Sequence, residues 1–493
     1  MKYVSTRNKE FYVTPSQAII QGISCDGGLF VPVEIPSLSL ENLEELNYKE
    51  LSYRIMSIFL DDFSEEQLKS CIDKAYDSKF DTDVIAPLVE VGNDFFLELY
   101  HGPTLAFKDM ALSILPHLLK NSLKINDIDD EVVILTATSG DTGKAALEGF
   151  ANVEGIKIVV FYPENGVSNI QKLQMKTQEG KNTFVVGING NFDDAQNGVK
   201  ELFNNRDFIR ELKEKRYILS SANSINIGRL IPQIIYYFYS YMTLIRNGRL
   251  EMGENINISV PTGNFGNILA AYYAKKMGLP VNKLICASNE NKVLTDFFET
   301  GIYDKRRDLY LSTSPSMDIL ISSNLERLLF HIGDEDDSLI KKVMTELFNN
   351  GFYHVKKDGL NEFYGDYSTE DEVVKAINET FEEFSYLMDT HTAVASSVAS
   401  KYRNKYNDDT KTLIVSTASP YKFADTVASA LGINIENKDE FEVIKLLSNE
   451  SKTNIPKSIL ELKDRPIIHD YNCGKSDMRE MVESFLKVGE YHD

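Results

Sequence analysis

The segment around Lys108 holds the residue types in this sequence that are best suited to do chemistry. Lys108 follows residues 102–107, Gly-Pro-Thr-Leu-Ala-Phe, and directly precedes Asp109. The Gly-Pro-Thr stretch predicts a turn, and apolar residues at helical spacing predict a helix over 109–119. A lone lysine is usually a solvated surface residue, but one at a loop-to-helix junction can point into a cleft. Partial removal from water lowers the pKa of its amine, so Lys108 is a candidate catalytic nucleophile and base.

A second segment, residues 263–267, has the composition of an anion site. It reads Gly-Asn-Phe-Gly-Asn and lies between an apolar run at 256–260 and a helix-like stretch at 268–277. Glycines let backbone N–H groups converge on a dianion at a helix N-terminus. The segment lacks the GxGxxG spacing of a dinucleotide site and the Gly-Lys-Ser/Thr ending of a P-loop. One amine and one phosphate cradle together indicate pyridoxal 5'-phosphate (PLP), whose aldehyde forms a Schiff base with lysine.

Two more loops follow apolar runs and carry small polar residues. Residues 136–143, Thr-Ala-Thr-Ser-Gly-Asp-Thr-Gly, lead into a helix-like stretch at 144–150 and favour binding of a carboxylate or phosphate. The alternative is that Ser139, Asp141 or Thr142 only caps that helix. In the loop 414–420, the hydroxyl of Thr417 could hydrogen-bond a ring nitrogen, and a cap or ST-turn is the alternative there.

The elements that must position these loops alternate between strand and helix. Between amphipathic segments, short apolar runs predict strands at 132–136, 156–162, 183–188, 256–260, 284–287 and 413–416. This pattern is typical of an α/β fold with mainly parallel sheets, which place ligands beyond the carboxyl ends of their strands. Helical stretches are expected over 41–75. A buried helix is expected over 230–245, because Pro232 and Gln233 interrupt the apolar run.

Composition narrows the class of partner. With 493 residues the chain is too long for one core, so two or three domains are expected. The net charge of −22 disfavours nucleic acid and anionic membranes, and no apolar stretch is long enough to span a bilayer. The four cysteines lack CxxC spacing and the N-terminus lacks a signal peptide, which indicates the cytoplasm. The histidines show no ligand spacing, so no metal site is expected.

Together these motifs resemble those of a known family, the longer form of threonine synthase, among the fold-type II PLP enzymes. The similar segments are residues 3–7, 21–22, 26–29, 101–109, 137–143 and 263–267. The resemblance implies a fold-type II α/β architecture, with two mainly parallel twisted sheets flanked by helices and an N-terminal α-rich region. It implies an N-terminal domain over 1–95 and a PLP-binding catalytic region over 96–493. That region would comprise a smaller subdomain at about 130–220 and a larger one at about 96–129 and 221–493.

The same resemblance implies a reaction, in which O-phospho-L-homoserine and water give L-threonine and phosphate. Lys108 would hold PLP and move the substrate protons, and Thr417 would face the pyridine nitrogen. Asp141 stands where related enzymes often use Asn near the 3'-oxygen, and a carboxylate there repels a phenolate unless a proton or another partner intervenes. The residues implied to hold the cofactor phosphate are Gly263, Asn264, Phe265, Gly266 and Asn267.

The substrate phosphate needs its own cationic site in so acidic a chain. Lys144 and Arg229 are the candidate cations, and solvated faces or helix caps are the alternative interpretation. The other candidate substrate-binding residues are polar ones in the same loops: Thr138, Ser139, Thr142, Ser168, Asn169, Gln171 and Asn226. His391 is interpreted as a hydrogen-bonded residue at a helix start.

Two other functions remain open from the sequence. Another fold-type II lyase, such as a threonine or serine dehydratase, would share Lys108 and the phosphate cradle but would need no second phosphate site. A catalytically silent relative that binds a ligand is disfavoured by the presence of Lys108. In each case a small molecule is the expected partner, and the chain is expected to be a monomer or homodimer.

Overall fold

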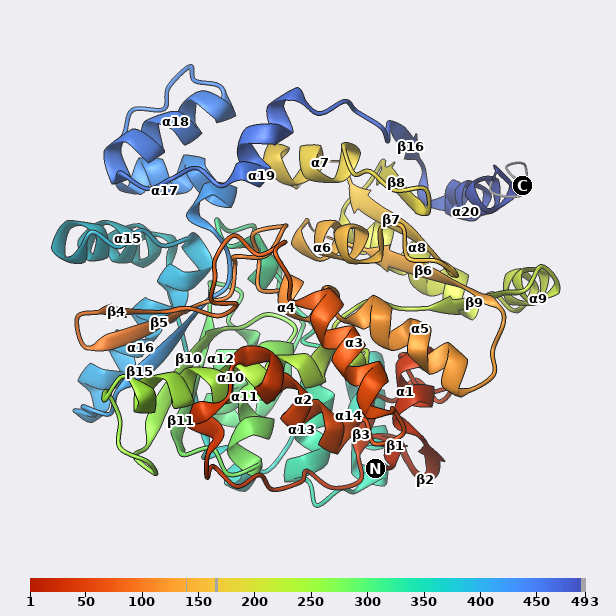
Figure 1. Cartoon of the computed structure of the whole chain (residues 1–493), viewed down its shortest axis with the longest axis horizontal. Helices are drawn as coiled ribbons and strands as arrows, with labels where there is room; N and C mark the ends of the chain where they lie inside the picture. Colours follow the sequence, from red (N-terminus) through yellow and green to blue (C-terminus); the bar gives the residue numbers. More distant parts are fainter. Residues whose placement is uncertain (139, 165–166, 489–493) are drawn as a thin grey trace.

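The computed structural model describes residues 1–138, 140–164 and 167–488 and contains two large sheets (Figure 1). The larger has the order β14 (Phe363–Tyr367), β11 (Val281–Ser288), β10 (Ile256–Pro261), β15 (Thr412–Ser416), β5 (Asp94–Glu98), β4 (Leu88–Val91). The smaller has the order β16 (Tyr471–Cys473), β8 (Thr183–Ile188), β7 (Ile156–Pro163), β6 (Glu131–Ala137), β9 (Tyr217–Ser220). Only the β4–β5 pair is antiparallel within these two sheets, which confirms the predicted α/β class.

Central strands of both sheets are buried along their length. Every residue of β10 is buried, and β7 is buried except for Lys157. Parallel strands covered by helices on both faces have this continuous apolar character, since neither face meets water. The six apolar runs recognised in the sequence all lie in these strands.

Helices pack on both sheets. On the larger sheet lie α11 (Gly266–Lys276), α12 (Val293–Thr300) and α16 (Thr390–Tyr406). Outside them, α15 (Glu370–Phe384) packs on α16 and on α17 (Ala424–Ala430), and α17 packs on α18 (Glu440–Ser451). On the smaller sheet lie α6 (Asp141–Phe150), α7 (Asn169–Lys176), α8 (Phe192–Asn204), α9 (Arg206–Glu214) and α20 (Met478–Val488). Other elements are the helices α13 (Leu325–Ile332), α14 (Asp337–Asn350) and α19 (Lys457–Leu460), the strands β12 (Ile302–Asp304) and β13 (Phe352–His354), and the 3₁₀ turns η1 (Leu43–Glu45), η2 (Pro315–Met317), η3 (Lys357–Leu360), η4 (Pro420–Phe423), η5 (Glu461–Asp464) and η6 (Lys475–Asp477).

The N-terminal region packs against one long helix. It consists of the three-stranded sheet β2 (Asn8–Val13), β1 (Tyr3–Ser5), β3 (Phe30–Pro32) and the helices α1 (Pro15–Gln21), α2 (Tyr48–Phe59) and α3 (Glu65–Ala75). Both α1 and α2 contact α10 (Ile227–Arg246), the helix expected over 230–245, which is buried along nearly its whole length. Within the described part of the chain, no helix combines the length and the apolar character that crossing a membrane requires.

The helix expected over 109–119 is divided in two. The first piece is α4 (Asp109–Leu112) and the second is α5 (Leu115–Ile125), which has a proline in its first turn. Pro116 has no N–H to donate to the carbonyl of Leu112, four residues earlier, so a continuous helix loses a hydrogen bond there. That carbonyl instead faces Gly149 of α6, where an added Cβ would lie 2.2 Å from the oxygen. The break therefore lets α6 approach the end of α4, the short helix that Lys108 precedes.

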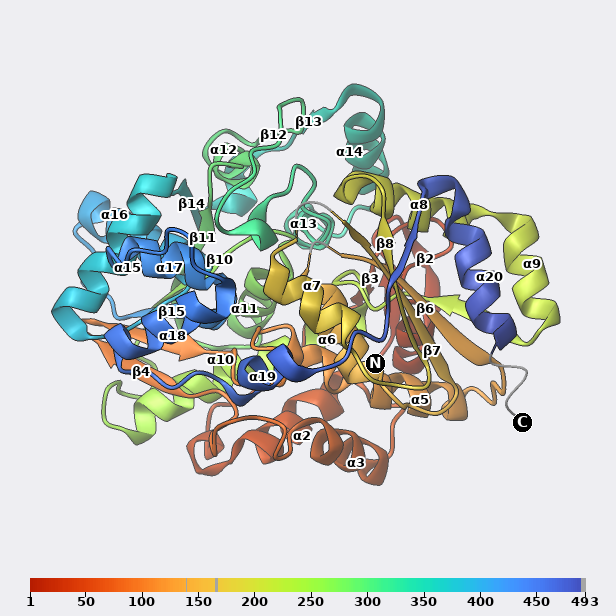
Figure 2. The ribbon, with the colours of Figure 1, turned by 90° about the horizontal axis from the view of Figure 1, so that it is seen from above.

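The C-terminal segment links the two sheets. After α18 the chain runs past α7 and pairs through β16 with β8, as the blue ribbon in Figure 2 shows. The backbone amides of Ile468 and His469 donate to the carbonyl of Lys176 at the end of α7 (2.8 and 2.9 Å). The predicted subdomain boundaries remain a prediction. The sheet topology adds residues 471–473 to the sheet formed within 130–220.

Candidate active site

Lys108 and Asp141 meet where the two sheets face each other. Lys108 precedes α4 on the side of the larger sheet, and Asp141 begins α6, directly after β6 of the smaller sheet. The Lys108 Nζ lies 3.5 Å from Asp141 Oδ2 and 3.4 Å from Ser316 Oγ. The Ser316 hydroxyl donates in turn to Asp141 Oδ2 (3.2 Å). The constellation thus joins three loops from distant parts of the sequence, in the position predicted for chemistry.

A second lysine holds the other oxygen of Asp141. Lys422 Nζ lies 2.5 Å from Asp141 Oδ1, and Gln171 Nε2 donates to the same oxygen (2.8 Å). The Lys422 side chain is 0% exposed. Burial alone would raise the pKa of Asp141, but the ammonium groups of Lys422 and Lys108 outweigh it and hold that pKa well below its usual range. The two lysines therefore favour the ionised form of Asp141.

The surroundings of Lys108 favour a neutral amine. Burial lowers the pKa of Lys108; Asp141 opposes this, and the positive charges of Lys422 and Arg229 lower it further. The side chain keeps 12% of its surface exposed, so a ligand in the cleft can reach it. The lowered pKa of Lys108 agrees with the effect that partial removal from water was expected to have on its amine.

The loop that carries Thr417 is bonded to the lysine segment. Phe107 N donates to Thr417 O (2.8 Å), Ser419 N donates to Leu105 O (3.1 Å), and the two segments form an isolated bridge between Ala106 and Ala418. Thr417 is buried beside this bridge. The residue expected to face a ring nitrogen therefore lies next to the residue expected to hold the cofactor.

A buried carboxyl shapes the turn before Lys108. The backbone N–H and the hydroxyl of Thr104 donate to the two oxygens of Asp109 (2.8 and 2.6 Å). Burial raises the pKa of Asp109 to about 6. A Cβ at Gly102 would lie 2.5 Å from the Cβ of Asp109, so the turn closes tightly only with glycine. These contacts fix the conformation of the turn from which the Lys108 side chain extends.

The segment 263–267 forms the N-terminus of α11. Phe265 is the N-cap residue with φ of +64°, and no side chain of the described ranges caps the first turn. At Asn267, Oδ1 accepts from the hydroxyl of Tyr236 (2.7 Å) and from that of Tyr237, whereas the buried Nδ2 has no partner among the described residues. A buried amide donor without a partner is costly, and an uncapped helix N-terminus attracts anions. The segment therefore suits the phosphate of PLP.

Gly263 allows another part of the site to approach this cradle. A Cβ added there would lie 2.6 Å from the carbonyl oxygen of Ser316. The hydroxyl of Ser322 donates to the Gly263 carbonyl (2.7 Å), which fixes the segment from the other side. The segment that carries Ser316 thus contacts the Lys108 amine, the Asp141 carboxylate and the cradle at 263–267. Together these groups fit PLP.

Arg229 enters the site from the first turn of α10. One guanidinium nitrogen donates to Ala222 O (2.7 Å), whereas the buried Nε has no partner among the described residues. Burial lowers the pKa of Arg229 to about 10, still far above neutrality, so the group is a cation. Asn226 caps the same helix, and its amide donates to Ile19 O (3.0 Å) in the N-terminal region.

The remaining predicted substrate residues lie in two neighbouring turns. Thr138 Oγ1 accepts from the backbone amides of Gly140 and Gly143 (3.0 and 2.8 Å) and so shapes the loop before α6. Thr142 lies in the first turn of α6. Ser168 caps α7 in a capping box with Gln171, and Asn169 follows it. Lys144 pairs with Glu148 (3.0 Å) and with Gln178, one turn along α6. Ser139 lies outside the described residues.

Two residues of the constellation were not anticipated from the sequence, namely Ser316 and Lys422. Ser316 lies in η2, and its backbone N–H donates to His391 Nε2 (3.2 Å). His391 is bonded through Nδ1 to Asp389, the N-cap residue of α16 (2.7 Å), so the histidine at the helix start helps to place Ser316. A serine next to Pro315 and a lysine after Pro420 carry no distinctive spacing that could have marked them.

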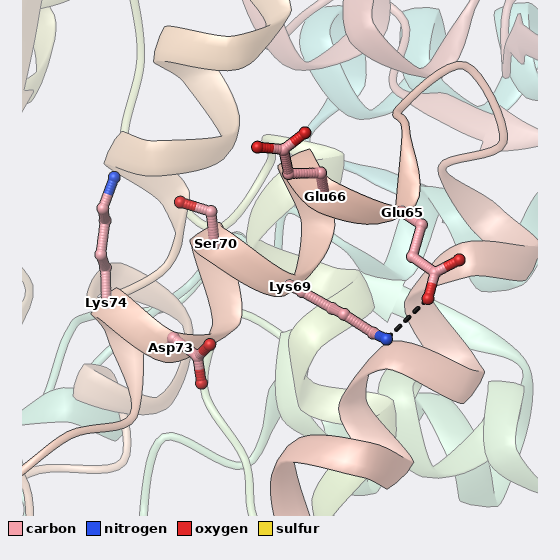
Figure 3. Close-up of a pocket in the computed structure, with 6 residues that line it drawn as sticks. All are labelled: Glu65, Glu66, Lys69, Ser70, Asp73 and Lys74. Atoms are coloured by element: carbon pink, nitrogen blue, oxygen red, sulfur yellow. Dashed lines mark hydrogen bonds and ion pairs between the residues drawn. The ribbon is translucent and has the colours of Figure 1, made fainter.

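A shallow hollow of about 700 Å³ lies elsewhere, over the outer face of α3 (Figure 3), and is lined by Glu65, Glu66, Lys69, Ser70, Asp73 and Lys74. All six residues belong to one helix, and Lys69 pairs with Glu65 four residues earlier (2.6 Å). No residue of the Lys108 constellation lines it. The hollow is a solvated helix face, separate from the candidate active site.

Comparison with family models identifies the class of protein that this fold and site define. The model of pyridoxal-phosphate dependent enzymes matches residues 86–418. Two further models, described as threonine synthase N terminus and threonine synthase C-terminal, match residues 2–76 and 392–466. The lysine, the cradle and Thr417 all fall within the first match. The chain therefore belongs to the class of pyridoxal-phosphate dependent enzymes.

Known proteins narrow the class to one family. The chain is 36% identical to threonine synthase of Schizosaccharomyces pombe, over 87% of this chain and 89% of that protein. The solved structure of PLP-bound threonine synthase from Brucella melitensis superposes with a TM-score of 0.86 at 34% identity, covering 98% of this chain and 99% of that one. The chain belongs to the threonine synthase family.

Other relatives are longer. Threonine synthase-like 1 of Macaca fascicularis is 40% identical over 96% of this chain. The chain spans 65% of the length of that relative. The family is therefore shared with proteins that carry additional sequence.

Proposed function

We propose that the chain is a PLP-dependent lyase that converts O-phospho-L-homoserine and water into L-threonine and phosphate. The observation that carries this proposal is the Lys108 amine, held 3.5 Å from an ionised Asp141, in a chain of the threonine synthase family. The full-length similarity to threonine synthases supports the same activity. The unpaired Nε of Arg229 supports a second anion site besides the cradle, which a dehydratase would not need.

Named residues would hold the cofactor in this proposal. Lys108 would bind it covalently and the segment 263–267 would hold its phosphate, with the Asn267 amide as one donor. Thr417 would face the pyridine nitrogen with a neutral hydroxyl, and Asp141 would lie near the 3'-oxygen. When bound, PLP supplies an electron sink for the carbon next to the substrate amine.

The chain's own groups account for the proton transfers. A neutral Lys108 amine would accept the proton from Cα, give that proton up, and then, neutral again, accept one from Cβ, while Arg229 holds the substrate phosphate until it leaves from Cγ. Contacts of Lys108 Nζ with Asp141 and Ser316 would keep the amine oriented between one proton transfer and the next. Lys108 would then return one proton to Cγ and one to Cα, water would add its OH at Cβ, and the departing phosphate would take up the proton that water releases before threonine leaves. Because Lys108 must be neutral at the start, its lowered pKa favours the first transfer.

The wider setting is also proposed. The substrate is a small anionic molecule and the chain acts as a monomer or homodimer without nucleic acid or a membrane. The four cysteines are all free thiols in the structure, which supports a reducing compartment such as the cytoplasm.

An assay of the purified full chain tests the proposed activity. With PLP and O-phospho-L-homoserine, threonine and inorganic phosphate are expected in equal amounts, and Lys108→Ala should abolish both together with the visible absorbance of bound PLP. Production of 2-oxobutanoate from L-threonine, with no phosphate released from O-phospho-L-homoserine, would instead identify a dehydratase. A chain that stays colourless with excess PLP would be a ligand-binding relative.

A further inference from the structure

Lys422 is a fully buried cation of the candidate active site, and the proposed reaction gives it no proton to move. Its side chain is 0% exposed, and its ammonium group contacts Asp141 Oδ1 (2.5 Å) and the Thr104 carbonyl (2.9 Å). A buried ammonium group persists only where a carboxylate and hydrogen-bond acceptors replace water. Lys422 therefore depends on Asp141, and Asp141 depends on Lys422.

The two oxygens of Asp141 face different groups. Oδ1 receives Lys422 and Gln171, neither of which reacts, whereas Oδ2 faces the Lys108 amine and the Ser316 hydroxyl. The charge on the Lys108 nitrogen changes as it gains and loses protons. Without Lys422, each loss of that charge would leave Asp141 buried without a cation.

The position of Lys422 in the fold connects it to both halves of the site. It lies in η4, which follows Thr417 and is capped by Ser419, and its second contact is to Thr104 in the turn before Lys108. One side chain therefore joins the Thr417 loop, the lysine turn and the start of α6. The Lys422 ammonium group therefore explains how Asp141, a carboxylate, can occupy a position where related enzymes often use a neutral amide.

We propose that Lys422 is the fixed counter-charge of the candidate active site, which holds Asp141 in place as a carboxylate while the charge on the Lys108 nitrogen changes. Lys422 is in this sense a positioning residue, and the inference deepens the proposed function, on which it rests. The other charged or titratable groups around the Lys108–Asp141 pair are Arg229 of α10, Asp109 of α4, Glu148 of α6 and His391 of α16. None of these four has a hydrogen bond or ion pair with Asp141 among the described contacts, so Lys422 alone fills this role.

The test measures the charge on the Lys108 nitrogen directly. The full-length holoenzyme is titrated with acid and base, and the midpoint pH at which the absorbance of bound PLP changes is recorded for wild type and Lys422→Met. Loss of the Lys422 charge leaves Asp141 free to stabilise the protonated form, so the midpoint should rise by at least about 1 pH unit. The matched control is Lys69→Met on the exposed face of α3, which should leave the midpoint unchanged.

A double variant removes both charges together. In Asp141→Asn/Lys422→Met both charges of the pair are removed and neither is left without its partner, so the midpoint should return toward that of wild type. If Lys422→Met does not fold, recovery of folding in the double variant supports the proposal, and a double variant no better folded than the single one overturns it. A folded Lys422→Met whose midpoint equals that of wild type also overturns it.

The same experiment in the full chain freed of PLP separates this inference from the proposed function. The rate at which cyanate carbamylates Lys108, followed by mass spectrometry against pH, should show the same displacement in Lys422→Met. A chain that forms no threonine but shows the displacement would contradict the activity and leave the counter-charge supported. A chain that forms threonine without the displacement would do the opposite.

Discussion

The buried Nε of Arg229 has no hydrogen-bond partner among the described residues, and this makes Arg229 the strongest candidate for binding the substrate phosphate. Charge-assisted hydrogen bonds contribute about 1.5–3 kcal/mol each, so Arg229→Met should raise the KM for O-phospho-L-homoserine by about 10- to 100-fold. The affinity for PLP should change by less than about threefold. Steady-state kinetics and a PLP absorbance titration measure the two effects.

Lys144 offers the matching comparison, since it is also a buried cation in the region. Its amine is already paired with Glu148 and Gln178, so Lys144→Met should raise KM much less than Arg229→Met does. The reverse order would place the phosphate-binding group on α6 instead of α10.

His101 gives the fold a pH-dependent contact. Its two ring nitrogens bond Asp81 (2.7 Å) and Glu98 (2.8 Å). Burial alone would lower the pKa of His101, but these two carboxylates outweigh it and raise the pKa to about 9. Because the folded pKa exceeds the unfolded value of about 6.5, the stabilisation is fully present below pH 6.5 and is lost as the pH rises through 9. His101→Gln should lower the free energy of unfolding by up to about 3 kcal/mol at pH 6 and by little above pH 9, as denaturant titrations would show.

His117 provides a control of opposite sign. Burial lowers the pKa of His117 to about 4, so its protonation opposes folding as the pH falls below 6.5. His117→Gln should gain stability relative to wild type between pH 6.5 and 4. A difference for His101→Gln that stayed constant from pH 6 to 10 would show that the imidazolium contact does not stabilise the fold.

At the level of single residues, the sequence singled out candidate groups that stand in recognisable motifs, and their roles remain a prediction. Lys108, Asp141, Thr417 and the segment 263–267 follow strands or turns whose composition is unusual. Ser316 and Lys422 could not be found this way, because their roles depend on distances between loops more than 170 residues apart in the chain, as the Ser316–Asp141 separation of 175 shows. A buried lysine also looks identical to a solvated one in sequence.

Among the elements, the cradle at the start of α11 depends on a close approach by η2. Gly263→Ala would place a Cβ 2.6 Å from the Ser316 carbonyl, and such overpacking costs about 1–3 kcal/mol. The free energy of unfolding should fall by this amount, and PLP should bind at least about tenfold more weakly as the cradle and η2 separate. Chemical denaturation and PLP titration measure both quantities.

Gly266 in the same cradle is the matched control. A Cβ there would meet nothing closer than 3.6 Å, so Gly266→Ala should change the free energy of unfolding by less than about 1 kcal/mol. Equal losses of stability in the two variants would mean that the contact with Ser316 does not matter.

The elements found from sequence were those with long apolar runs. The six predicted strands are real, whereas β14 went unrecognised because Phe-Tyr-Gly-Asp-Tyr contains Gly and Asp, which disfavour strands in isolation. The extended conformation of β14 depends on its parallel pairing with β11. The break between α4 and α5 was missed for the converse reason, since apolar spacing continued across Pro116 although the backbone could not.

For the whole molecule, Arg327 connects the N-terminal region to the cradle. It is 0% exposed and donates to Phe30 O (2.9 Å), Ile225 O (2.6 Å) and Asn324 Oδ1 (2.5 Å). Asn324 in turn donates to the Asn264 carbonyl (2.9 Å). Arg327→Met should lower the free energy of unfolding by about 3 kcal/mol or more and weaken PLP binding about tenfold, as unfolding curves and PLP titration would show.

Arg246 at the exposed end of α10 is the corresponding control. It hydrogen-bonds the Thr243 hydroxyl (2.8 Å) in a solvated setting, so Arg246→Met should cost less than about 1 kcal/mol and leave PLP binding intact. If the two arginine variants bound PLP equally well, the connection from β3 to the cradle would have no bearing on the cofactor.

The contact between Arg327 and Phe30 also bears on how such polypeptides can be shortened or recombined. A version that starts after residue 76 would lack Phe30, one of the three acceptors of the buried Arg327 guanidinium, so we expect residues 77–493 alone to be less stable than the full chain and to bind PLP more weakly. In chimeras between relatives, β3 and α13 would have to be exchanged as a pair.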